Sequence, residues 1–126
     1  MSISSPPIVA AFGNRLRLRV CGFLIRDHEL LLVKHLHIGP KGVLWAPPGG
    51  GMDFSENATV TLKREFMEET GLEINVLDLA VVNEYLDLPL HAVELFFNVE
   101  ETGGRLTQGH DPEISGEDQI IREVRF

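Results

Sequence analysis

The 126-residue sequence has a single cysteine, one tryptophan, one tyrosine and no long hydrophobic run. Because Cys21 is alone, the chain can form neither an internal disulfide bond nor a thiolate metal cluster, which favours a reducing compartment. No apolar stretch approaches the length of a membrane span or of a signal-peptide core. These absences predict a soluble protein of the cytoplasm.

Basic residues are also scarce. Eleven Lys and Arg residues stand against nineteen Asp and Glu residues, which gives a formal charge of −8 at pH 7. Such a chain repels nucleic acid and anionic membrane surfaces unless it carries a basic patch, so we expect neither as a partner. The nearest candidate is Arg15, Arg17 and Arg19, whose alternate spacing in a strand is more typical of a solvated face than of a phosphate-binding track.

The length and a hydrophobic content of 44% are enough to bury one core, so residues 1–126 are predicted to form a single domain. Residues 1–14 contain Pro6-Pro7 and end in Gly13-Asn14, which is typical of a loose or edge-packing N-terminal arm. Residues 16–25 and 29–34 flank a polar turn and are predicted to form a hairpin of half-buried strands. Further strands are predicted at 43–45, 74–82, 91–100 and 120–126, with turns at 87–89 and 102–104.

A glycine-rich corner precedes a well-bounded helix. In the corner, residues 46–51, the prolines fix φ and the glycines allow positive φ, so the chain can turn tightly. Asp53 or Ser55 is suited to cap the following helix, with Glu56 placed as in a capping box. Gly71 is suited to end the helix in a left-handed conformation.

The helix carries three carboxylates on one side. At about 100° per residue, Glu65, Glu68 and Glu69 fall within an arc of about 100°. Phe66, Leu62 and Thr59 project from an adjoining side, which is predicted to pack against the rest of the domain. Like charges so close repel one another and raise their pKa values, so the arrangement favours a compensating cation. Oxygen ligands favour Mg²⁺ or Mn²⁺ over zinc. Without the glycine corner, such a helix would more simply face solvent and pair with its own Lys and Arg residues.

The segment from Gly50 to Leu72 resembles the signature of the Nudix (MutT-like) hydrolase family. The resemblance implies an α/β/α sandwich with a mixed β-sheet, in which the signature forms a strand, a loop and a helix. Phe66 is an aromatic residue in a position where the family usually has an aliphatic one. The matching positions are Gly50, Glu56, Arg64, Glu65, Phe66, Glu68, Glu69, Gly71 and Leu72.

The family fold normally ends with a helix on the opposite face of the sheet, whereas this chain stops at Phe126. An open apolar face is larger than monomers usually expose. We therefore expect that a final helix was removed from this sequence, or that the N-terminal arm or a second copy of the chain, in a homodimer, covers that face.

Taken residue by residue, the resemblance implies roles for the signature side chains. Arg64 is implied to orient a glutamate through a salt bridge, which suits a guanidinium that can grip a carboxylate with two hydrogen bonds. Glu56 is implied to be a ligand or a brace for the ligands. The remaining implied metal ligands are Glu65, Glu68, Glu69 and the carbonyl of Gly49.

The implied reaction is metal-dependent hydrolysis of a P–O–P bond in a nucleoside diphosphate derivative. Nucleoside triphosphates, ADP-ribose and other nucleotide sugars are the substrate candidates. The general base stays open between Glu65 and an acidic residue of a later loop, where Glu113 is preferred because Pro112 stiffens its approach. The other candidates in that loop are Asp111, Glu117 and Asp118.

The alternative interpretation is a non-catalytic nucleotide-binding or sensing module of the same fold, although the signature has lost none of its glutamates. Tyr85 is suited either to a nucleoside pocket or to the core. Five further side chains are candidates for the pocket but are more typical of packing or surface positions: Trp45, Phe96, His35, His37 and His91.

Overall fold

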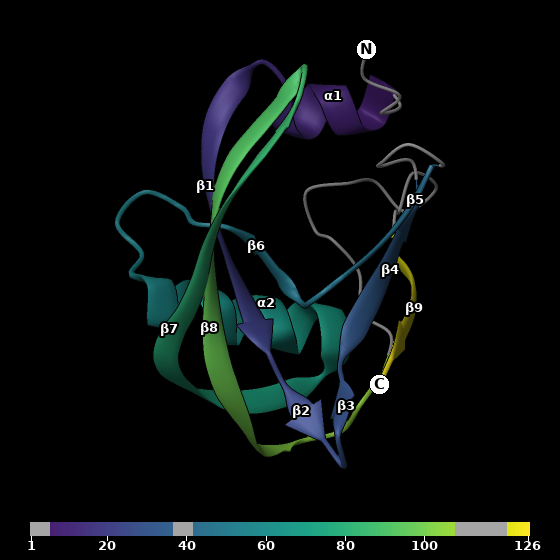
Figure 1. Ribbon diagram of the computed structural model, residues 1–126, viewed down its shortest axis with the longest axis vertical. Coiled ribbons are helices and arrows are strands. Elements are labelled where there is room, and N and C mark those ends of the chain that lie inside the picture. The colour runs from purple at the N-terminus through teal and green to yellow at the C-terminus, as the bar shows by residue number, and fades with distance from the viewer. Residues whose placement is uncertain (1–5, 37–41, 108–120) are drawn as a thin grey trace.

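The computed structural model describes residues 6–36, 42–107 and 121–126 (Figure 1). In chain order its elements are α1 (Pro6–Phe12), β1 (Arg15–Phe23), β2 (Ile25–Arg26), β3 (Glu29–Leu30), β4 (Leu32–Leu36), β5 (Val43–Ala46), β6 (Gly49–Gly51), α2 (Ala58–Thr70), β7 (Leu72–Asp87), β8 (Leu90–Gly104) and β9 (Ile121–Arg125).

The strands form two main sheets. Four of them make a mixed sheet in the order β6-β1-β8-β7, in which β1 and β8 run parallel and the other neighbours run antiparallel. A second, antiparallel sheet has the order β5-β4-β9. Figure 1 shows α2 against the lower half of the four-stranded sheet, while β1, β7 and β8 continue beyond it toward α1. The predicted α/β class with a mixed sheet is confirmed.

The hairpin predicted between residues 16–25 and 29–34 is wrong over most of its length. Only the short strands β2 and β3 pair, around a turn in which Asp27 and His28 have positive φ. Beyond them the N–H of the buried Leu31 donates to the carbonyl of the buried Leu24 at 2.9 Å, and β1 and β4 then enter different sheets. Burial of these two leucines in the core separates the strands, which periodicity alone does not reveal.

Helix α2 begins later than predicted and ends where predicted. Asn57 caps its first turn, because the Asn57 side chain accepts a hydrogen bond of 2.8 Å from the Val60 N–H. Asp53 and Ser55, the predicted caps, lie in the loop before it. At the other end Gly71 has a φ of 77° and donates its N–H to the Met67 carbonyl, as predicted for a left-handed stop.

The main core lies between α2 and the four-stranded sheet. Phe66 and Leu62 of α2 are fully buried, as predicted, whereas Thr59 is exposed. A Cβ on Gly22 of β1 would lie 2.6 Å from the Phe66 ring, so this glycine allows the aromatic ring to approach the strand. The aromatic residue at position 66 is therefore accommodated by a missing side chain opposite it. The buried cluster contains Val20, Leu24, Leu31, Leu62, Phe66, Leu72, Ile74 and Val99.

A smaller core lies between the two sheets near α1. Phe12, at the end of α1, is buried with Val33 of β4 and Leu90 of β8. The segment predicted to be a loose or edge-packing arm thus contains a helix that the sequence analysis did not predict. Its Pro-Pro start is compatible with a helix, because proline is tolerated in the first turn.

Strands β7 and β8 are longer than predicted. They pair antiparallel from Leu72 with Gly104 to Asp87 with Leu90, so the turn predicted at residues 102–104 is strand. The turn predicted at residues 87–89 does connect them. The long pairing carries the sheet well past the end of α2.

Candidate active site

The glycine corner forms β6, which pairs with β1 and faces α2. A Cβ on Gly49 would collide with the Val20 carbonyl of β1, and a Cβ on Gly50 would collide with the Glu65 carboxylate of α2. Among the described residues, positive φ at glycine is found at Gly42, Gly71 and Gly104 and not in the corner. The predicted reason for these glycines is therefore wrong, because they serve the close approach of neighbouring groups instead.

Two of the three predicted carboxylates are buried beside β6. Glu65 and Glu69 are 7% and 5% exposed, and they lie one helical turn apart on the same side of α2. The backbone N–H of Gly49 lies 3.4 Å from a Glu69 side-chain oxygen and donates to it. The prediction that the carboxylates gather next to the glycine corner thus matches their positions.

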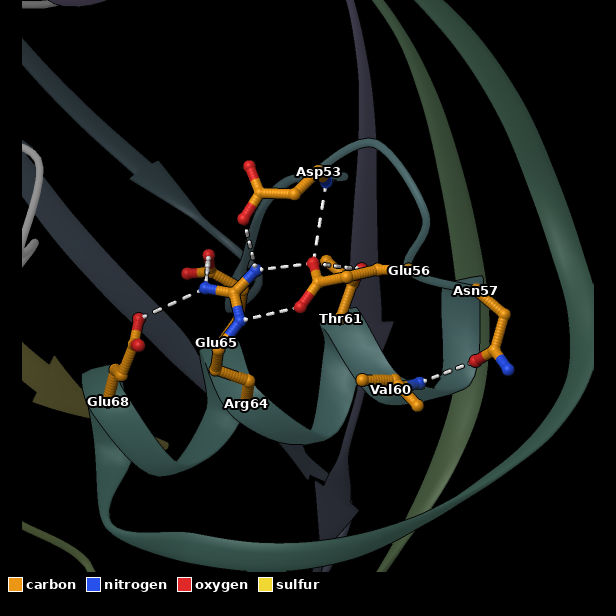
Figure 2. Close-up of polar contacts among 8 residues, drawn as sticks. All are labelled: Asp53, Glu56, Asn57, Val60, Thr61, Arg64, Glu65 and Glu68. Atoms are coloured by element: carbon orange, nitrogen blue, oxygen red, sulfur yellow. Dashed lines mark hydrogen bonds and ion pairs between the residues drawn. The ribbon is translucent and has the colours of Figure 1, made fainter.

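Arg64 contacts three of the acidic side chains of the signature. Its Nη2 and Nε atoms donate to the two Glu56 carboxylate oxygens, at 2.9 and 3.3 Å, so the pairing is bidentate (Figure 2). Its Nη1 donates to Glu65 at 3.0 Å and lies 3.5 Å from Glu68. Arg64 therefore positions several carboxylates, whereas the family resemblance implied that it orients a single glutamate.

The Glu56 carboxylate is held as a brace. Thr61 donates its hydroxyl to Glu56 at 2.9 Å, and Asp53 lies 3.5 Å from the Arg64 Nη2 atom. The hydrogen bonds from Arg64, and next the one from Thr61, lower the pKa of Glu56. Sequence reasoning missed Thr61 and Asp53 as parts of this network. The signal for Thr61 was its position one turn before Glu65, on the side of the helix that faces the loop.

The charge of the buried Glu69 carboxyl group is compensated only in part. Burial, followed by the adjacent Glu65 charge, raises the pKa of Glu69 well above its usual range, although Arg19 and the Gly49 N–H oppose the shift. The close approach of the Glu65 side chain raises the pKa of Glu69 further. A cation bound here would offset the repulsion between the two carboxylates.

The donor set fits a hard divalent cation. Its side-chain donors are carboxylate oxygens, and the buried Oε2 atom of Glu68 makes no hydrogen bond, although it lies 3.5 Å from the Arg64 Nη1 atom. Within the described residues, no three Asp, Glu, His or Cys side chains already surround one point closely enough to hold an ion. The glutamates lie on one side of α2, but their carboxylates do not yet surround a common point. Rotation of the side chains would bring them to a common ion.

The other predicted candidates lie elsewhere. Glu113 and its neighbours Asp111, Glu117 and Asp118 fall outside the described residues, as does His37. His91 pairs with Glu84 at 2.7 Å, and Trp45 contacts the cationic groups of Lys34 and Arg125. His35 is buried in the second sheet, and burial, followed by the charge of Arg19, lowers its pKa to about 4. Phe96 stacks on Phe23, whereas Tyr85 packs against the smaller core.

The chain is similar to known proteins over most of its length. It is 33% identical over 94 residues to an ADP-ribose pyrophosphatase of Methanocaldococcus jannaschii, an alignment that covers 73% of this chain and 55% of that protein. This chain therefore spans about half the length of that curated relative. None of the helices in the described parts of the chain has the length and apolar character to cross a membrane.

Solved structures of low sequence identity share the fold. A NUDIX hydrolase from Nitrosomonas europaea superposes with a TM-score of 0.70 at 17% identity, covering 88% of this chain and 71% of that one. An ADP-ribose pyrophosphatase from Streptococcus suis gives 0.63 at 19% identity, with 87% and 72% covered. A MutT NUDIX hydrolase from Burkholderia pseudomallei gives 0.65 at 22% identity, with 88% and 81% covered.

The model of the NUDIX domain matches residues 15–119, which include both the glycine corner and α2. With the mixed sheet, the signature helix and this match in agreement, the chain belongs to the Nudix hydrolase family.

Proposed function

We propose that this chain is a Mg²⁺-dependent pyrophosphohydrolase that cleaves a P–O–P bond in a nucleoside diphosphate derivative. The observation that carries the proposal is the pair Glu65 and Glu69, buried side by side against a strand of glycines, with the pKa of Glu69 raised. Perturbed carboxyl groups in such a setting are typical of functional sites. The single cysteine supports a reducing compartment, the cytoplasm, as the place of the reaction.

ADP-ribose is the substrate we propose first. The support is the curated relative of 33% identity, which is an ADP-ribose pyrophosphatase. Other nucleotide sugars and nucleoside triphosphates share the diphosphate group that the signature would act on, so they follow as candidates. Loops outside the signature decide among them, and these loops are where relatives of one fold differ.

The proposed reaction adds water across the diphosphate. The water oxygen forms a bond to one phosphorus, the bridging P–O bond breaks, and the bridging oxygen leaves with the other phosphate. The proton released by the water goes to a carboxylate, for which Glu65 and Glu113 are the proposed acceptors. Arg64 holds Glu56 and Glu65 beside each other, which limits the side-chain movement needed when the ion and the substrate bind.

We propose Glu65, Glu68 and Glu69 as the side chains that hold Mg²⁺ or Mn²⁺, with Glu56 and the Gly49 carbonyl as the further donors. When bound, the ion supplies positive charge that makes water more acidic and offsets the charge of the leaving phosphate. The buried Oε2 atom of Glu68, which makes no hydrogen bond, and the raised pKa of Glu69 support a cation at this place.

The proposal is tested by incubating the protein with ADP-ribose and Mg²⁺ and measuring AMP and ribose 5-phosphate by chromatography. We expect steady turnover by the parent, loss of turnover with EDTA, and a fall in kcat of at least about a hundredfold in Glu69→Gln. The matched control is Glu73→Gln, which changes an exposed glutamate three residues beyond the end of the helix. This variant should behave like the parent.

A wider panel that includes UDP-glucose and a nucleoside triphosphate separates the substrate from the reaction type. If none of these compounds is cleaved by the parent, while calorimetry shows that ADP-ribose binds, the non-catalytic nucleotide-binding module replaces the enzyme. Equal activity of Glu69→Gln and the parent would instead contradict the proposed metal site.

A further inference from the structure

A row of polar side chains crosses the four-stranded sheet. Arg19 of β1 lies beside Glu94 of β8, and Glu94 lies beside Asn83 of β7, so the three side chains share one face of the sheet. Arg19 pairs with one Glu94 oxygen at 2.5 Å, and Asn83 donates to the other at 3.0 Å. Glu94 is buried, whereas 21% of the Arg19 side chain is exposed, so solvent still reaches this row.

His35 of β4 lies opposite the polar row, on the inner face of the second sheet. Val33 precedes it by two residues on the same face of β4 and packs with Leu90 of β8. Leu90 and Glu94 are four residues apart on β8 and therefore share a face of the first sheet. The charge of Arg19 also acts on the His35 ring. Position and charge thus both place His35 near the Arg19–Glu94 pair.

The His35 ring has a buried nitrogen atom that nothing satisfies. The residue is 8% exposed, and among the described residues its Nδ1 atom has no hydrogen-bond partner. Burial of such an atom loses its hydrogen bond to water without a replacement, and native proteins contain few of them. Val33 and Leu90 nearby are apolar, so an aliphatic side chain would pack at position 35 without this cost. The unpaired nitrogen therefore indicates contact with a ligand.

The charge state of the ring selects the kind of ligand. Burial, followed by the charge of Arg19, lowers the pKa of His35 to about 4, so the ring is neutral at neutral pH. A neutral ring lacks the charge that makes hydrogen bonds to phosphate strong. A hydroxyl group suits it instead, because a hydroxyl can donate to a ring nitrogen or accept from it, whichever nitrogen carries the proton.

We propose that the Nδ1 atom of His35 hydrogen-bonds to a ribose hydroxyl of the substrate. This inference rests on the proposed function. Arg19 is near both places, since its charge acts on Glu65 and Glu69 as well as on His35. In ADP-ribose each phosphate carries a ribose through a single methylene group. A diphosphate held at the glutamates therefore brings a ribose close to Arg19, with its hydroxyl groups within the region that His35 borders.

The test compares ADP-ribose with two analogues, one without the 2′ and 3′ hydroxyls of the adenosine ribose and one without those of the terminal ribose. In the parent, kcat/KM should fall about tenfold for one of the two analogues. His35→Leu should lower kcat/KM for ADP-ribose by a similar factor and leave that analogue nearly unchanged, because the lost contact is the same. His35→Gln, which keeps a hydrogen-bonding group, should lose less. A purely structural role of His35 would lower the activity on all three compounds equally.

Isothermal titration calorimetry in EDTA buffer measures the same preference without turnover. The dissociation constant of ADP-ribose should rise about tenfold in His35→Leu, and that of the sensitive analogue should not change. The matched control is His91→Leu, which removes a histidine of β8 that is already paired with Glu84, and it should match the parent on every compound. Thermal unfolding shows whether each variant keeps the fold. If His35→Leu does not fold, the preference of the parent and of His35→Gln decides the inference.

The two proposals can fail separately. If the parent cleaves ADP-ribose and both analogues equally well, or if His35→Leu keeps the preference of the parent, the inference is wrong and the proposed function stands. If ADP-ribose binds in a way that depends on His35 and on a ribose hydroxyl while no compound is cleaved, the inference stands and the enzymatic proposal falls. A parent that neither binds nor cleaves ADP-ribose would overturn both.

Discussion

The two ends of the four-stranded sheet differ in what covers them. At one end α2 packs on the sheet and Val20, Leu62 and Phe66 are fully buried. At the other end the same face continues along β1 and β7, where Leu16 and Leu86 are 65% and 59% exposed. One helix therefore supplies both the core of this sheet and the carboxylates of the site. Stability and the proposed chemistry are concentrated at the same end of the molecule.

The largest expected effect tests whether the stability of the fold is concentrated at the end of the sheet that α2 covers. Phe66→Ala removes a fully buried ring and should lower the free energy of unfolding by about 3–5 kcal/mol. Leu86→Ala, at the exposed end, should change it by no more than about 0.5 kcal/mol. Denaturant unfolding followed by circular dichroism measures both. Similar losses in the two variants would mean that the exposed end is covered in solution.

A smaller effect concerns His35, which is buried in the second sheet with a pKa lowered to about 4 and with its Nδ1 atom unpartnered. The unfolded chain binds a proton at its ordinary pKa near 6.5, whereas the folded chain does not until the pH falls to about 4. Stability from this group is thus fully present above pH 6.5 and is lost as the pH falls toward 4. The expected loss is on the order of 2–3 kcal/mol.

The measurement is denaturant unfolding at pH 7.5 and at pH 4.5. His35→Gln should lose less stability between the two values than the parent, and His91→Gln, which changes a partly exposed histidine of β8, should match the parent. Because carboxyl groups such as Glu69 titrate in all three proteins, their contribution cancels in the comparison. Equal pH dependence of His35→Gln and the parent would contradict the prediction.

The smallest expected effect concerns association through the exposed end. We predict that a second copy of the chain covers it, because Leu16 and Leu86 are exposed there and the Glu84 carboxylate on the same face is hydrogen-bonded to His91. Exposed apolar surface of this kind is typical of a protein–protein contact. Leu86→Lys should weaken the dimer about tenfold, or about 1.4 kcal/mol, in sedimentation equilibrium. An exposed residue of α2 offers the control, Val60→Lys, and a parent that is monomeric at all concentrations would contradict the prediction.

Sequence patterns correctly predicted the features that depend on the type and spacing of residues close together in the chain. The left-handed stop at Gly71 and the apolar side of α2 with Phe66 follow from spacing along the chain. The register of the glutamates beside the glycine corner was also predictable, because helical periodicity fixes which side chains share a face. Arg64 bridges Glu56 and Glu65 at once. This contact depends on side-chain rotamers, which the spacing of residues along the chain does not specify.

The errors all depend on contacts between distant segments. The hairpin failed because burial of Leu24 and Leu31 sends their strands to different sheets. The glycines of β6 were assigned to backbone freedom, whereas the neighbours that require them are a β1 carbonyl and the Glu65 carboxylate.

Three consecutive glycines leave β6 without a side chain on either face. Its peptide units can therefore approach β1 and α2 more closely than any other residue type would permit. A substitution at position 49 or 50 would push the strand away from the Val20 carbonyl or from the Glu65 carboxylate, even if every charged residue were retained.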